Sequence, residues 1–120
     1  MANTQDAYQG VERASDSRFP HAPPDWTRET AAEIARQEQL TLGDDHWVVV
    51  RGLQEFFARH EYGVVNLREL HDALEERFHH KGGMQYLYTL LPGGPIAQGC
   101  RLAGLKPPSG AIDLSFGSVA

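Results

Sequence analysis

The chain lacks long apolar runs and has almost no cysteine. None of its apolar stretches approaches the roughly 20 residues that a bilayer-spanning helix needs. The first 26 residues, MANTQDAYQGVERASDSRFPHAPPDW, contain no apolar core that could act as a secretory signal. Cys100 is the only cysteine, which excludes an intramolecular disulfide and suits a reducing compartment. We therefore expect a cytoplasmic protein.

The chain also lacks an excess of positive charge. It has 11 Lys and Arg against 16 Asp and Glu, which gives a net charge of -5. Generic binding to phosphate backbones is disfavoured by this balance. Segment 66–81, the candidate recognition helix, carries three cations and four carboxylates, or -1 (3 - 4). Nucleic acid is therefore an unfavoured partner.

Motifs for metal binding and hydrolysis are missing as well. His79 and His80 are adjacent, and neighbours on a helix point about 100° apart. The other histidines form no HxxxH pair, and no cysteine cluster is present. Ser109 is not in a G-x-S-x-G elbow, and Gly93-Gly94 is not followed by Lys-Ser/Thr. The sequence predicts no metal, no cofactor and no self-sufficient hydrolase.

What the chain does contain is helical periodicity within the length of one domain. Residues 1–24 are polar and predict a flexible or extended N-terminal arm. Residues 25–104 predict a helical domain, and 105–120 predict a C-terminal arm because Pro107 and Pro108 exclude a helix. The expected fold is mainly α, a small single-domain bundle of about five helices with irregular ends.

Caps and breakers predict the helix limits. The expected ranges are 27–39, 44 to a stop at Gly63, 66–81, 84–91 and 95–104. Asn66 followed by Glu69 predicts a capping box at the start of the third helix. The expected buried faces are Ala31, Ile34 and Ala35 with Trp26 as anchor; Trp47, Val50, Leu53 and Phe57; Leu67, Leu70, Leu74 and Phe78; Met84, Leu87, Tyr88 and Leu91; and Ile96 with Cys100.

Cys100 has two interpretations. A free cysteine often serves as a small buried hydrophobe. A reactive thiol instead requires partial exposure and a lowered pKa. Arg101 is adjacent in the sequence, and the fold could bring Lys81 and Lys106 close. The residues alone leave both interpretations open.

The order of several motifs resembles the TusE/DsrC family of sulfur-relay proteins. The motifs are DWTRE, then DDHW, then YG at the end of the second helix, then KGG and YLYTLLPGGPIAQGCRLAGLKPPSG. The resemblance spans roughly residues 25–111 and is most specific over 85–110.

This resemblance implies a small helical fold with a C-terminal arm. Family members are carriers that accept sulfur as a cysteine persulfide and pass it between partner proteins. One branch serves thiolation of the wobble uridine of tRNA, and another serves dissimilatory sulfite reductase and sulfur oxidation. DsrC-type members carry two cysteines, whose positions match Cys100 and Ala111, and TusE-type members keep the arm cysteine.

The sequence departs from the family pattern in the arm. Ala111 cannot hold a persulfide, and nine residues follow it. Before DW there is no alternating pattern for the hairpin that relatives usually have, and Gly43 replaces a frequent threonine cap. The resemblance therefore identifies a divergent paralogue.

Two functions follow from the resemblance. The first is a persulfide carrier that uses Cys100, with Arg101, Lys106 and Lys81 favouring the thiolate. It is at most a sulfurtransferase-type carrier, working between a donor sulfurtransferase and an acceptor of the sulfur-relay or sulfite-reductase type. The second is an interaction or regulatory paralogue that docks on relay partners or DNA without carrying sulfur. A monomer or weak homo-oligomer is expected in either case.

Overall fold

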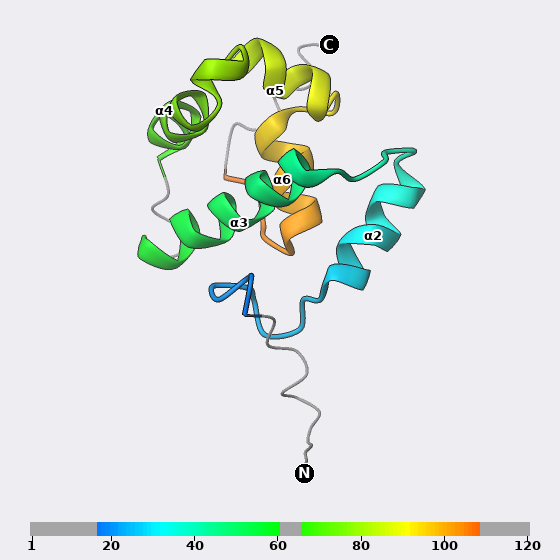
Figure 1. Cartoon of the computed structure of the whole chain (residues 1–120). Coiled ribbons are helices and arrows are strands. Elements are labelled where there is room, and N and C mark those ends of the chain that lie inside the picture. Colours follow the sequence, from blue (N-terminus) through cyan, green and yellow to red (C-terminus); the bar gives the residue numbers. More distant parts are fainter. Residues whose placement is uncertain (1–16, 61–65, 109–120) are drawn as a thin grey trace.

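The computed structural model describes residues 17–60 and 66–108, which form a helical bundle (Figure 1). Its elements are α2 (Arg28–Gln37), α3 (Asp44–Arg59), α4 (Leu67–Arg77), the short 3-10 helix η1 (His79–Lys81), α5 (Met84–Leu90) and α6 (Pro95–Ala103). No strand occurs in the described residues, so the mainly helical prediction is confirmed there. None of these helices is long and apolar enough to cross a membrane.

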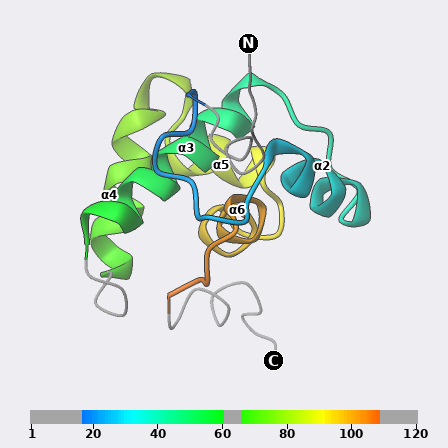
Figure 2. The same cartoon turned by 90° about the horizontal axis from the view of Figure 1, so that it is seen from below.

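Helix α6 lies at the centre of the bundle, in contact with α2, α3 and α5 (Figures 1 and 2). All of its residues except Arg101 are buried. Pro95 occupies its first turn, and Gly104 ends it in the left-handed conformation with φ 78°. Both limits agree with the sequence prediction. The central position of α6 is what buries Cys100.

Close contact between α6 and α3 depends on Gly99. A Cβ atom added there would lie 2.7 Å from Cδ1 of Leu53 and 3.4 Å from Cγ1 of Val49. Leu53 and Val49 are themselves completely buried. The missing side chain therefore lets the two helices approach each other.

Helix α2 is a thinner layer, held at its start by Trp26. Only Ala31 and Ala35 of this helix are buried. Thr27 caps the helix in a capping box with Thr30. The indole of Trp26 donates a 2.7 Å hydrogen bond to the carbonyl of Leu102. The prediction that Trp26 anchors α2 is therefore confirmed.

Helix α4 ends earlier than expected, at Arg77 instead of Lys81. The carbonyl of Phe78 accepts from the amides of Lys81 (2.9 Å) and Gly83 (2.8 Å), which tightens the chain into η1. Gly82 and Gly83 then have φ values of 122° and 64°, conformations that favour glycine. Phe78, at the start of this turn, is buried in the core.

The expected capping box of α4 forms only in part. Asn66 accepts from the amide of Glu69 (3.1 Å), as predicted. The carboxylate of Glu69 does not bond back to the cap, because it lies 3.9 Å from Nε2 of His60. Tyr88 was also placed wrongly, since it is 45% exposed, whereas Tyr86 packs against the core.

The described part of the N-terminal segment, residues 17–26, is irregular but joins the core. Phe19 is buried, with ring centroids 5.0 Å from Trp26 and 5.7 Å from Trp47. A domain boundary after residue 24 therefore omits a core side chain. The predicted stop at Gly63, residues 1–16 and Ala111 lie outside the described residues.

Candidate functional site

The only thiol of the chain is sealed inside the bundle. Cys100 is free and its side chain is 0% exposed. Burial raises its pKa to about 12, because the thiolate is poorly solvated there, and the charge of Arg101 offsets this only in part. The thiol is therefore protonated at neutral pH in this conformation.

The residues that flank Cys100 hold α6 against its neighbours. Arg101 donates to both carboxylate oxygens of Glu38, from Nε (2.8 Å) and Nη2 (3.0 Å). Gln98 donates to the same carboxylate (2.8 Å) and accepts from the amide of Gly93 (2.9 Å). These bonds, first among them the one from Arg101, lower the pKa of Glu38. The QGCR motif thus ties α6 to the end of α2 and to the PGGP turn.

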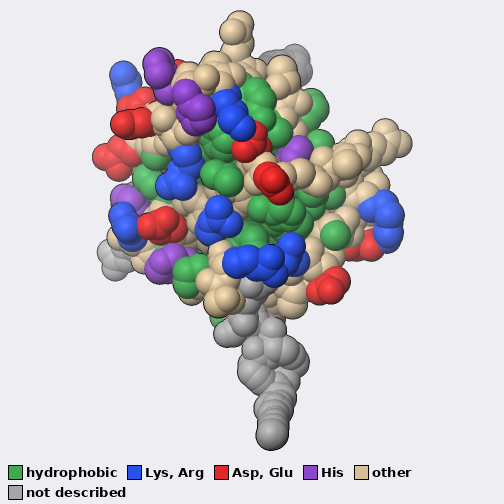
Figure 3. All heavy atoms as spheres, in the orientation of Figure 1, with side chains coloured by type: hydrophobic (Ala, Val, Ile, Leu, Met, Phe, Trp, Pro, Cys, Tyr) green, Lys and Arg blue, Asp and Glu red, His purple; other side chains and the backbone are tan. Residues whose placement is uncertain are grey.

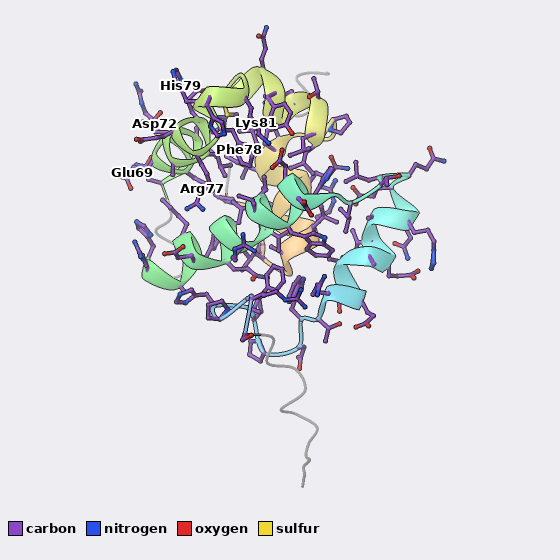
Figure 4. All side chains as sticks on the ribbon, viewed as in Figure 1. Glu69, Asp72, Arg77, Phe78, His79 and Lys81 are labelled. Carbon is purple, nitrogen blue, oxygen red and sulfur yellow. The ribbon has the colours of Figure 1, made fainter. Side chains whose placement is uncertain are left out.

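The other predicted cations lie elsewhere. Lys81 pairs with Asp45 (2.9 Å), which also accepts from the Tyr86 hydroxyl, and Figure 4 shows Lys81 beside α5. Lys106 is exposed at the start of the C-terminal arm. Arg101 is the one described cation whose charge lowers the pKa of Cys100. The structure therefore brings one of the three predicted cations to the thiol.

The DDHW motif has a clear structural role. His46 is buried, and its Nδ1 accepts from the amide of Gly43 (3.0 Å). Its Nε2 therefore carries the proton and donates to the carbonyl of Leu90 (2.9 Å). This histidine therefore satisfies the amide of Gly43, which is the reciprocal half of a capping box, and it joins α3 to α5. In the described part of the chain, no three side chains of His, Cys, Asp or Glu gather as metal ligands would.

Sequence reasoning missed a pocket of about 440 Å³ where the C-terminal arm begins. It is lined by His21, Pro23, Gln54, Phe57, Ala58, Gly104, Leu105 and Lys106. Gln54 is 1% exposed, and its Nε2 donates to the carbonyl of Ala103 (3.0 Å). Its Oε1 is buried and has no partner among the described residues. A glutamine inside the apolar stripe of α3 is the one signal that could have indicated this site.

A second groove, of about 290 Å³, runs between α3 and α4. Arg77 reaches across it, and a Cβ atom added to Gly52 would lie 3.6 Å from the guanidinium carbon (Figure 4). Figure 3 shows Lys and Arg side chains spread over this face among apolar atoms. Two of the cations stack on rings, with Arg28 5.2 Å from Trp47 and Arg51 5.8 Å from Phe19. Arg28 and Arg51 thus both contact the ring of Phe19 in the N-terminal segment.

Comparison with known proteins agrees with this architecture. The family described as "DsrC like protein" matches residues 9–112. Sulfurtransferase TusE of Photorhabdus laumondii is 33% identical over 103 residues, covering 84% of this chain and 92% of that protein. Sulfurtransferase TusE of Buchnera aphidicola is 31% identical over 108 residues, covering 89% and 93%.

A solved structure of a DsrC protein has a similar fold. The NMR structure of Allochromatium vinosum DsrC superposes with a TM-score of 0.61 at 36% identity, over 72% of this chain and 77% of that one. The fold of this chain thus has a counterpart in a protein of known structure. From the family match, the identities and the shared fold, the chain belongs to the DsrC-like family, among the relatives of the TusE sulfurtransferases.

Proposed function

We propose that this protein acts in cytoplasmic sulfur relay and that Cys100 is the thiol that carries the persulfide. The observation that supports the proposal is the position of the only cysteine within the QGCR segment of α6, in a chain that is 33% identical to a TusE sulfurtransferase. The partners would be a donor sulfurtransferase and a relay or sulfite-reductase-type acceptor. The sulfur would go to tRNA thiolation or to dissimilatory sulfur metabolism.

The chemistry requires a thiolate at Cys100. The thiolate attacks the outer sulfur of a donor persulfide, a new S–S bond forms on Cys100, and the donor leaves as a thiolate. An acceptor thiolate then removes the same outer sulfur and regenerates Cys100. Because Cys100 is 0% exposed, this transfer needs a local opening around α6. In the closed state the charge of Arg101 favours the thiolate but only partly offsets burial.

Burial also favours a second candidate function. A thiol with a pKa of about 12 and no exposed surface has the properties of a structural cysteine. A chain with Ala111 in the arm and a sealed Cys100 would dock on sulfur-relay partners without carrying sulfur. This docking paralogue needs no opening of α6.

Persulfide loading distinguishes the two functions. The protein, its Cys100→Ser variant and a two-cysteine relative are incubated with a persulfide-charged sulfurtransferase and weighed intact by mass spectrometry. A carrier gains one sulfur atom, and the Cys100→Ser variant gains none. If the relative is loaded while this protein stays unmodified, persulfide carriage is refuted and the docking function stands.

A further inference from the structure

The pocket where the C-terminal arm begins has the features of a binding site. Three separate parts of the chain build it: the N-terminal segment with His21 and Pro23, the C-terminal half of α3, and residues 104–106. Its volume of about 440 Å³ is large enough for a few amino-acid residues. Phe57 and Leu105 give it apolar walls.

Gln54 supplies the first specific feature of this pocket. Its amide orientation is fixed, because Nε2 donates to the carbonyl of Ala103. Turning the amide over would set oxygen against oxygen, so Oε1 is the atom left without a partner in the described part of the protein. A buried acceptor without a donor is destabilising, and native proteins retain few of them. Gln54 lines the pocket, and its Oε1 lies just beneath the wall as an acceptor that still lacks an N–H donor.

Charge supplies the second feature. The lining residues include Lys106 and His21 but no carboxylate. No ion pair joins Lys106 to a described residue, and its side chain is exposed. The pocket thus presents one ammonium group and no carboxylate, in a chain with a net charge of -5. Its complement is an anionic group.

We propose that this pocket docks a short acidic segment of a partner protein. An N–H of the segment donates to Oε1 of Gln54 after a small movement of the wall, a carboxylate pairs with Lys106, and an apolar side chain packs on Phe57. Bound there, the partner lies at the first residues of the arm, six positions after Cys100. The proposal rests on the proposed function only in that it supposes a protein partner, and it holds for both the carrier and the docking paralogue.

NMR titration of the full-length protein tests the site with defined probes. The probes are acetyl-Asp-Leu-Asp-Leu-amide, its Lys-for-Asp counterpart and an N-methylated acidic version that lacks backbone N–H groups. We expect the acidic peptide to shift the amide signals of Phe57, Ala58 and residues 104–106, and the other two peptides to bind at least about fivefold more weakly, the change that loss of one contact of this size produces.

Two variants and one charge-matched control locate the site without touching the core. Lys106→Glu is expected to weaken acidic-peptide binding at least about fivefold, whereas Arg68→Glu, an equal charge change on exposed α4, leaves it unchanged. Ala58→Trp, on the exposed edge of the pocket, is expected to abolish binding sterically.

Several outcomes would overturn the docking site. Shifts spread over the whole protein, equal binding of the basic peptide, or equal losses in the Lys106 and Arg68 variants would each do so. Equal binding of the N-methylated peptide would mean that water, not a partner, satisfies Gln54. Tighter binding of a short single-stranded RNA than of the acidic peptide would show that the pocket binds nucleic acid instead of an acidic protein segment. None of these results depends on persulfide loading of Cys100, so failure of the pocket and failure of sulfur carriage are separable.

Discussion

At the scale of single residues, the pKa of Cys100 is determined more by burial than by the charge of the adjacent Arg101. Adjacency of Arg101 left an activated thiol open as one of two interpretations. In the structure the Arg101 guanidinium is engaged by Glu38, and burial outweighs its effect on the thiol pKa. A charge one residue away could be read from the sequence. The solvent around the sulfur could not, because it depends on how α6 packs.

Alkylation of Cys100 measures this effect. With a pKa of about 12 instead of 9.0, the thiolate fraction at pH 8 is lower by about three orders of magnitude. We expect iodoacetamide to modify the native protein at least about 100-fold more slowly than the protein unfolded in guanidinium chloride. Native and unfolded rates within tenfold of each other would show that the thiol is open in the free protein.

Glu38 makes stability depend on pH. Its pKa is lowered in the folded protein from 4.5, so its contribution is complete above that value and is lost as the pH falls through the folded-state pKa. Glu38→Gln is expected to reduce the free energy of unfolding by about 0.5–1 kcal/mol at pH 7, and the difference from the parent protein should shrink below pH 4.5. Urea unfolding at both pH values measures it.

Glu76→Gln is the control for the Glu38 experiment. Glu76 is exposed on α4 and makes no ion pair with a described residue. Its substitution should change stability little at either pH. A Glu38 variant that loses the same stability at low and at neutral pH would contradict an ionic role for the carboxylate.

At the scale of helices, alanine substitutions at two glycines in helix interiors should change the free energy of unfolding in opposite directions. Gly99→Ala places its methyl group 2.7 Å from the buried Leu53 and should cost about 1–3 kcal/mol. In Gly52→Ala the methyl group meets only Arg77 at 3.6 Å, so the better helix propensity of alanine should add about 0.5–1 kcal/mol. Denaturant unfolding of both variants checks the pair. Equal effects would mean that α3 and α6 are not in tight contact.

Helix limits were predictable where local chemistry sets them. Pro95 and Gly104 delimit α6, and Thr27 and Asn66 cap α2 and α4, because these residues act within one turn. The early end of α4 was not predictable, since the apolar spacing runs on to Phe78, where the turn through η1 begins. Tyr88 was misplaced because helical spacing gives a face but not its width. Leu87 and Leu91 of the predicted face are buried, whereas Tyr88 is 45% exposed.

At the scale of the molecule, the segment before α2 is part of the cooperative unit. Phe19 is 3% exposed between two tryptophans, so Phe19→Ala should lower the free energy of unfolding by about 3 kcal/mol. Pro20→Ala, at the exposed neighbouring position, should have little effect. Thermal unfolding followed by tryptophan fluorescence measures both. An unchanged midpoint for the Phe19 variant would place residues 17–26 outside the core.

Motifs predicted the bundle and its central cysteine, but not the pocket beside the arm. A pocket built from residues 21–23, 54–58 and 104–106 exists only after three distant segments meet. No spacing rule joins them. The glutamine at position 54 was visible in the apolar stripe, but its unpaired oxygen is a property of the folded chain.

The burial of α6 has a consequence for the use of QGCR as a signature. Every residue of PIAQGCRLA except Arg101 lies inside the protein, and Arg101 itself bonds to Glu38. Packing in the core constrains these residues whether or not the protein carries sulfur. The QGCR signature alone is therefore not evidence of sulfur carriage, because packing constrains the same residues.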